Sequence, residues 1–327
     1  MIQQKFGRAW QQFFFMPQSP LPIALFRIFY GLCVSGTVIL LHSDWLNWFG
    51  VHSWVSLSTM QTLEPGVRLN LFTVMPQNDH FIALFFWVFL GFCVLLTVGL
   101  WTRFSSVAVF LCLTSIQQRN LFITNGGDTF LRVAGFFLMF APAGAALSLD
   151  RLRRVRKGLE SSEILPKAPW AQRMIQLELS FLYCLSFWWK MKGVTWRNGT
   201  ALYYVMHLHD LQRFPLPGWV QYPAVLRMGS WFTLVLELSL GVLIWFRPFR
   251  YPLLLLGLLF HLCLEYALNI PMFEWIILSA YVLFIEPADL MAMGKIIRGR
   301  LKWRRGAATS AAPLPTLKRS SPNGGAS

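Results

Sequence analysis

The sequence predicts an all-α membrane protein, a polytopic bundle of about eight transmembrane helices with both termini on the cytoplasmic side. Three observations lead to this prediction. Hydrophobic residues make up 55% of the 327 residues, whereas charged residues make up only 13%. Several apolar stretches approach the roughly 20 residues that a helix needs to cross a bilayer. The basic residues are also distributed unevenly among the loops between these stretches, as the charge rule for membrane topology requires.

The apolar stretches are bounded by Pro, Gly, Asn or charged residues, which mark the expected ends of helices. The first stretch is too long for a cleavable signal peptide and starts after a lead of charged and aromatic residues, so we interpret it as a permanent helix. Together the stretches form one predicted transmembrane domain, residues 19–287. The expected helices cover 22–41, 80–99, 104–123, 129–147, 173–190, 224–246, 251–268 and 271–286.

The charge distribution supports an even number of crossings. With the N-terminus inside, 20 of the 29 Lys and Arg residues fall in predicted cytoplasmic segments. This topology explains the net charge of +15, and nucleic-acid binding is not expected because no soluble segment is long enough to present a basic face. We therefore expect a multi-pass protein of a bacterial cytoplasmic (inner) membrane, with the lipid bilayer as its main surroundings.

The segments outside the helices have distinct compositions. Residues 1–18 contain FGRAWQQFFFM, which predicts an interfacial helix on the cytoplasmic side. The long outer loops 42–79 and 191–223 are rich in aromatic residues and Pro, which favours short helices lying on the membrane surface. Residues 288–327 form a basic cytoplasmic tail, expected to be disordered after about 303 because it is rich in Pro, Gly, Ala and Ser.

Ionisable residues inside the predicted helices are costly, at about 2.5 to 3.5 kcal/mol each near a helix centre. They must therefore pair with one another or line a polar pocket, and both alternatives stay open from the sequence. Asp128 and Arg132 lie four residues apart, as do His261 and Glu265, so each pair shares a helix face. The full set is Arg27, Arg132, Glu178, Glu237, His261, Glu265 and Glu274.

Two lysines in YCLSFWWKMKGVTW contradict the charge rule, because Lys190 and Lys192 fall at the outer end of the fifth helix. They either extend to the interface beside the tryptophans or belong to a buried site. No metal site is expected: the five Cys residues show no C-x-x-C spacing, and HLH at 207–209 lacks a third ligand at a known spacing.

Several stretches, in this order and spacing, resemble the HTTM (horizontally transferred transmembrane) domain family, which includes the membrane domain of the vitamin K-dependent gamma-carboxylases. The stretches are PLPIALFRIFYG at 20–31, GLWTRFS at 99–105, TNGGDTFLR at 124–132, LSLDR at 147–151, WWKMKGVTWRNGTALYY at 188–204, and His261 with IPMFEW at 270–275.

The resemblance implies that Lys190 is a general base, as in the carboxylases, where a lysine deprotonates vitamin K hydroquinone. Lys192 is close enough to leave this assignment open. A quinone such as menaquinone or vitamin K hydroquinone is the cofactor that this resemblance implies. The chain departs from the carboxylases at 125–128, where NGGD offers no imidazole in place of their catalytic histidine.

Two functions are carried forward, and enzymatic activity is left open between them. In the first, the protein is a carboxylase-like enzyme that acts on a quinone, a lipid-like substrate or a secreted peptide. Lys190, Asp128 and His261 are then the candidate catalytic residues, and the candidate cofactor-binding residues are Arg132, Glu265, Trp189 and Trp196. In the second, it is an accessory factor for the maturation or export of a secreted peptide or toxin, with that peptide or a thioredoxin-like protein as partner.

Overall fold

The computed structural model describes residues 2–296, except 64 and 67, and within them it is helical. The only strand-like pairing among these residues is two isolated bridges, Gln18 with Lys167 and Gln212 with Leu268. The predicted all-α class is therefore confirmed. The expected disorder after about 303 lies outside the described residues.

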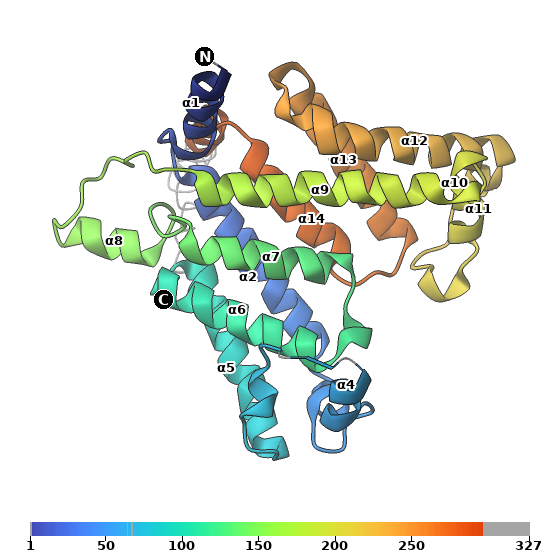
Figure 1. The fold of residues 1–327 in the computed structure, drawn as a ribbon, viewed down its shortest axis with the longest axis horizontal. Coiled ribbons are helices and arrows are strands. Elements are labelled where there is room, and N and C mark those ends of the chain that lie inside the picture. Colours follow the sequence, from blue (N-terminus) through green and yellow to red (C-terminus); the bar gives the residue numbers. More distant parts are fainter. Residues whose placement is uncertain (1, 64, 67, 297–327) are drawn as a thin grey trace, which may run out of the picture. The chain divides into compact units, whose positions relative to one another are not determined.

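Helices form at each of the eight predicted windows, and their bounds agree with the apolar stretches to within a few residues at most ends (Figure 1). The largest differences are two early ends: at Phe140, before the turn that contains Pro142, and at Tyr281, where a 3₁₀ turn over Val282–Phe284 follows. These helices are α2 (Leu21–Leu40), α5 (Asp79–Val98), α6 (Thr102–Arg119), α7 (Gly126–Phe140), α9 (Trp170–Lys192), α12 (Pro223–Val242), α13 (Arg247–Ala267) and α14 (Phe273–Tyr281).

Length and composition single out four of the described helices as able to cross a membrane: α2, α5, α12 with its 3₁₀ extension, and α13. The number rises to five if 273–284 and 287–296 count as one broken span. The other described helices fall below this length or apolarity; α9, for example, carries several charged and amide side chains. Eight crossings and cytoplasmic termini remain predictions.

The aromatic loops 42–79 and 191–223 and the N-terminal segment also contain short helices. They are α1 (Ile2–Phe15), α3 (Trp45–Phe49), α4 (Leu57–Leu63), α10 (Val194–Arg197) and α11 (Ala201–Met206), with α8 (Leu149–Arg156) between α7 and α9. The structure also contains short 3₁₀ turns between or after these helices. They are η1 (Leu71–Thr73), η2 (Leu121–Ile123), η3 (His209–Leu211), η4 (Gly218–Gln221), η5 (Leu243–Trp245) and η6 (Val282–Phe284). Exposed aromatic rings on α1, such as Trp10 and Phe6, suit an interface position.

Within residues 1–285, successive helices pack as neighbours: α2 on α5, α5 on α6, α6 on α7, α7 on α9, and α9 along α12 (Figure 1). The short helix α14 contacts α2, α7, α9 and α13, so it fills the centre of this arrangement. Accordingly, Ile276, Ile277 and Ala280 of α14 are completely buried.

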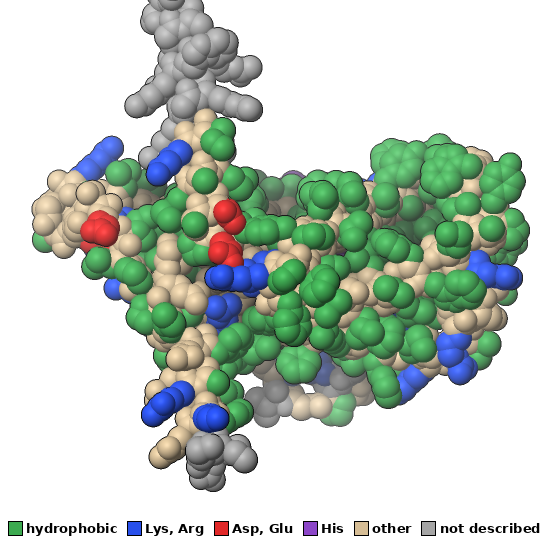
Figure 2. Space-filling model, turned by 90° about the horizontal axis from the view of Figure 1, so that it is seen from above, with side chains coloured by type: hydrophobic (Ala, Val, Ile, Leu, Met, Phe, Trp, Pro, Cys, Tyr) green, Lys and Arg blue, Asp and Glu red, His purple; other side chains and the backbone are tan. Residues whose placement is uncertain are grey.

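The outer surface is strongly apolar. Hydrophobic side chains cover much of the face in Figure 2, and large residues such as Phe181, Leu255 and Val235 are more than half exposed. An exposed apolar surface of this extent marks contact with lipid or with another protein. It fits a membrane protein whose polar residues point inward.

One junction joins three segments that are distant in sequence. The Arg27 guanidinium of α2 is fully buried and donates to the carbonyl oxygens of Ala143 (2.9 Å) and Leu147 (2.6 Å), which follow α7. Gly99, at the end of α5, approaches this guanidinium so closely that a Cβ there would lie 2.5 Å from Arg27 Nη1. Gly99 also has a φ of +70°, which favours glycine.

The same junction continues to α8. The Asp150 carboxylate accepts hydrogen bonds from the backbone N–H of Trp101 (2.9 Å) and Thr102 (2.7 Å) and from the Thr102 hydroxyl. Burial works against the charged carboxylate, but these hydrogen bonds outweigh it and lower the pKa of Asp150 below its usual value. Three of the stretches that carry the family resemblance, at 20–31, 99–105 and 147–151, therefore meet in one place.

Candidate functional site

The C-terminal end of α9 carries an ion pair with α12. Lys190 Nζ contacts the Glu237 carboxylate and also donates to the Ser186 hydroxyl at 3.0 Å. Ser186 in turn donates to the same Glu237 oxygen at 3.2 Å. Because Ser186 lies one helical turn before Lys190, α9 presents both groups to Glu237 on one face.

Glu237 is the more deeply buried member of the pair, with 5% of the residue exposed. Its Oε1 atom receives both contacts, whereas its buried Oε2 atom has no hydrogen-bond partner within the described residues. Buried carboxylate oxygens are normally satisfied, so an orphan acceptor indicates a place for a water molecule or a ligand donor. Glu265 and Glu178 each also have one buried oxygen without a described partner.

A second polar cluster lies one to two turns earlier on α9. The Tyr183 hydroxyl is 2.7 Å from His261 Nε2 on α13 and 2.7 Å from the Tyr281 hydroxyl on α14. His261 Nδ1 contacts the Glu274 carboxylate, and both side chains are at most 3% exposed. Gly257 makes room for Tyr281, since a Cβ there would lie 2.3 Å from the hydroxyl.

This cluster forms a chain of carboxylate, imidazole and phenol groups. A carboxylate on one ring nitrogen orients the imidazole and leaves the other nitrogen to exchange a proton with a hydroxyl. Tyr183 lies three residues before Ser186 on α9. The two clusters are thus neighbours along α9, and together they can hold or move protons inside the bundle.

Glu265 does not join His261, although the two share a face of α13. It pairs instead with Arg213 of the 191–223 loop and accepts a hydrogen bond from Trp275 Nε1 at 3.0 Å. The backbone N–H of Arg213 also donates to the Ala267 carbonyl at 3.1 Å. The Glu265 pair therefore ties the 191–223 loop to the end of α13.

Different tryptophan rings lie beside the two lysines. Trp196 lies 5.1 Å from Lys190 Nζ, measured to the ring centroid. Lys192 Nζ lies over Trp189 at 4.3 Å and over Trp188 at 5.2 Å, and both of these rings are exposed. Lys192 thus has the surroundings of an interface anchor, whereas Lys190 has a buried carboxylate partner.

Asp128 acts as a helix cap. Its carboxylate accepts from the backbone N–H of Asn125 at 2.9 Å, while the Asn125 side chain accepts from the N–H groups of Gly127 and Asp128. This reciprocal capping box starts α7. Arg132, one turn later, is half-buried and makes no hydrogen bond or ion pair with Asp128 within the described residues. Neither residue is bonded to the clusters on α9.

The structure therefore brings Lys190, Trp196 and His261 to one side of the bundle and adds partners that sequence reasoning did not place. Glu237 and Glu274 were recognised only as costly charges, and Tyr183, Ser186 and Tyr281 were not singled out. Positions 183, 186 and 190 have the spacing of a single helix face, and this was the available signal for α9. No comparable signal links α9 to α12 or α14.

The comparisons with known proteins agree with this architecture. The model of the HTTM domain matches residues 15–288, which is most of the chain. The chain is therefore a membrane protein and belongs to the HTTM domain family. The uncharacterized protein YitO of Bacillus subtilis (strain 168) is 24% identical over 296 residues, covering 80% of this chain and 92% of that protein. No solved structure matches the chain.

Proposed function

We propose that this HTTM protein is a membrane enzyme that removes a proton from a quinol or another hydroxylated lipid-like substrate, with the Lys190–Glu237 pair as the proton-accepting unit. The observation that supports this most is Glu237 Oε2, a buried acceptor without a partner among the described residues. A substrate hydroxyl would satisfy it. The proposed setting is a multi-pass protein of a bacterial cytoplasmic membrane.

The roles follow from the chemistry of the two groups. A lysine acts as a base only as the neutral amine, and its contact with a carboxylate suits the charged ammonium. We therefore assign the first hydrogen bond from the substrate to Glu237 and the positioning of that carboxylate to Lys190 and Ser186. The Glu274–His261–Tyr183 chain is assigned the onward movement of the proton.

The residues present fit a quinol in their polar chemistry. Glu237 Oε2 can accept from one ring hydroxyl, and Trp196 beside Lys190 offers an aromatic surface. A bound quinol would supply the acidic O–H group and an oxidisable ring. Arg132 and Asp128 are not needed in this proposal, because α7 holds them apart from the α9 clusters.

A reconstitution experiment tests the proposal. Wild type and Glu237→Gln would be placed in nanodiscs with menaquinol, and binding would be measured by retention of the quinol in mass spectra. Lys192→Gln is the matched control, because it removes a lysine from the same helix end without touching Glu237. We expect Glu237→Gln to weaken quinol retention about tenfold, in line with loss of one charged hydrogen bond, and the control to retain it. Equal retention in all three proteins would sink the proposal.

The accessory function is a second candidate because some charged groups form separate ties between elements. Arg213–Glu265 joins a loop to α13, and His261–Glu274 joins α13 to α14, as expected for structural pairs. In this case a secreted peptide or a thioredoxin-like protein would be the partner. Crosslinking in the native membrane would recover such a partner from cells carrying Glu237→Gln as efficiently as from wild type.

A further inference from the structure

A cavity of about 780 Å³ lies at the opposite end of α7 from its capping box, between α6, α8 and the segment that leads to α9. Its wall includes Leu138, Phe140, Leu165 and Trp170, so much of the lining is apolar. The volume falls in the range of sites that bind small molecules. None of the Lys190, Glu237 or His261 groups lines it, so the cavity is separate from the proposed proton-transfer site.

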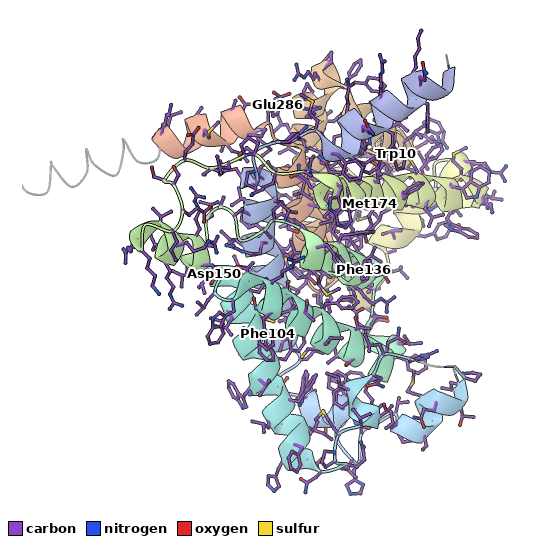
Figure 3. The ribbon with its side chains drawn as sticks, turned by 60° about the vertical axis from the view of Figure 1, so that its left-hand side comes forward. Trp10, Phe104, Phe136, Asp150, Met174 and Glu286 are labelled. Atoms are coloured by element: carbon purple, nitrogen blue, oxygen red, sulfur yellow. The ribbon has the colours of Figure 1, made fainter. Side chains whose placement is uncertain are left out.

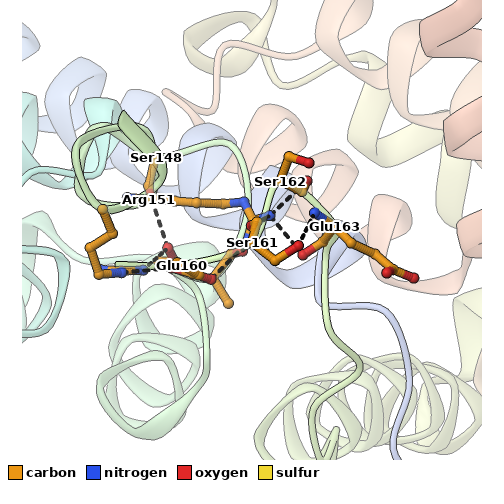
Figure 4. A network of polar contacts seen from close by, with 9 residues as sticks. Ser148, Arg151, Glu160, Ser161, Ser162 and Glu163 are labelled. Atoms are coloured by element: carbon orange, nitrogen blue, oxygen red, sulfur yellow. Dashed lines mark hydrogen bonds and ion pairs between the residues drawn. The ribbon is translucent and has the colours of Figure 1, made fainter. Parts of the chain in front are cut away.

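The segment 159–168 is held in place over this cavity by a buried arginine on α8. Arg151 donates to the Glu160 carboxylate at 2.6 Å and to the carbonyl oxygens of Ser161, Ser162 and Glu163 at 2.9 to 3.1 Å (Figure 4). These contacts shape the outer wall before any ligand binds. The cavity is therefore a formed feature of the fold.

Both carboxylates of the lining are already used. Asp150 accepts three hydrogen bonds from Trp101 and Thr102, and the two Glu160 oxygens contact Arg151 and Arg154. The hydrogen bond from Arg154 lowers the pKa of Glu160. Neither acid is available to neutralise a further cation.

Two basic side chains of the lining have no acidic partner within the described residues. Arg103 and Lys167 line the cavity, and within the described residues their side chains make no hydrogen bond or ion pair. Lys167 acts on Glu160 only through a longer-range electrostatic interaction. Its backbone is nonetheless fixed, because it pairs with Gln18 through two hydrogen bonds of 2.8 Å. Two exposed cations without a described acid partner, beside a cavity whose wall is partly polar and partly apolar, suit a ligand that is anionic at one end and apolar at the other.

Exposed aromatic residues adjoin the lining residue Arg103 in the sequence. Phe104, labelled in Figure 3 on α6 near Asp150 of α8, is 59% exposed, and Trp101 is 62% exposed. Aromatic rings beside basic residues are typical of the headgroup level of a membrane. A phosphate is the anion that arginine and lysine recognise best in this setting.

We propose that this cavity binds a phosphate ester with an apolar body, with Arg103 and Lys167 on the phosphate. An anionic phospholipid and a soluble phosphorylated metabolite share this chemistry. The lipid is the source that the exposed Trp101 and Phe104 favour.

Lipid retention in native mass spectra tests the site. Full-length protein would be exchanged into phosphatidylcholine nanodiscs with or without phosphatidylglycerol. The double variant Arg103→Gln/Lys167→Gln would be compared with Arg153→Gln/Arg156→Gln, which removes the same charge from the exposed face of α8. We expect the cavity variant to bind phosphatidylglycerol about 25-fold more weakly, from roughly fivefold per cation, and the control to keep near wild-type binding.

A charge-conserving variant and a competing ligand complete the experiment. Arg103→Lys/Lys167→Arg keeps both charges and should restore binding if the variants are folded alike. Glycerol 3-phosphate would then be added: displacement of the lipid indicates a soluble phosphate ester, and no displacement indicates a membrane lipid. Equal weakening in the cavity and control variants, or no retention by wild type of either ligand, would overturn the proposal.

Discussion

Two regions of the molecule bury positive charge in different ways. At the junction of α2, α5 and α8, Arg27 is surrounded by backbone carbonyl oxygens and has no carboxylate within hydrogen-bond distance among the described residues. On α9, Lys190 is paired with Glu237, whose second oxygen is left without a described partner. At the junction the atom without a described partner is a donor, Arg27 Nε, whereas at the α9 site it is an acceptor, Glu237 Oε2. The difference is one of sign, because only a free acceptor can take the hydrogen of a hydroxyl, which is the role that the proposed function gives to Glu237.

Removing the arginine of the junction should have the largest effect. Arg27→Met would leave the carbonyl oxygens of Ala143 and Leu147 buried without a donor, at a cost of about 3 kcal/mol or more. Thermal unfolding in detergent measures this loss. Arg132→Met on α7, where the arginine has no described partner, is the control and should change stability little. If the two variants were equally stable, Arg27 would not be a structural centre.

The second-largest effect on stability is expected from breaking the Lys190–Glu237 pair. Lys190→Met leaves a buried carboxylate unpaired and should cost about 2 to 3 kcal/mol, whereas Lys190→Met/Glu237→Gln should recover most of it. A thermodynamic cycle of the two single variants and the double variant gives the coupling energy. A coupling energy near zero would show that Lys190 is an interface anchor like Lys192.

A side chain at Gly99 should destabilise the protein by a smaller amount. Gly99→Ala places a Cβ against Arg27 and Ser148 at a positive φ, and should destabilise the protein by about 2 kcal/mol. Gly91→Ala within α5 is the matched control, because no atom lies within 4 Å of its added Cβ. That substitution is expected to be neutral or slightly stabilising. Unfolding of both variants side by side separates local strain from a general effect of alanine.

The smallest expected effect is the contribution of the Asp150 carboxylate to stability. This contribution decreases as the pH falls. The pKa of Asp150 is lowered in the folded state, so its contribution is complete above the unfolded pKa of about 4 and is lost as the pH falls through the folded pKa. Asp150→Asn should therefore cost about 1 kcal/mol at neutral pH and progressively less in acid. The measurement is the difference in unfolding midpoint from wild type at each pH.

Glu163→Gln, an exposed change in the neighbouring segment, should alter the midpoint little at neutral pH. A difference for Asp150→Asn that stayed constant down to strongly acid pH would contradict the role of its carboxylate in holding the start of α6.

Much of the fold was predictable because local chemistry specifies it. The apolar windows define the helices, and the Asn125–Asp128 spacing identifies the start of α7. Sequence spacing was misleading for His261 and Glu265, which share a face of α13 but take different partners, Glu274 and Arg213. A helix face carries no information about which helix or loop will cover it.

The sequence by itself therefore determined the class of protein: a helical membrane protein of the HTTM family, with ionisable residues at known places along its helices. Only the tertiary structure decided their partners. Lys190 meets Glu237 across 47 positions, and Arg27 meets a carbonyl oxygen 120 positions away. The physical reason is that backbone carbonyls are present at every residue, so no side-chain pattern marks the ones that will face a buried cation. Packing of the helices selects them.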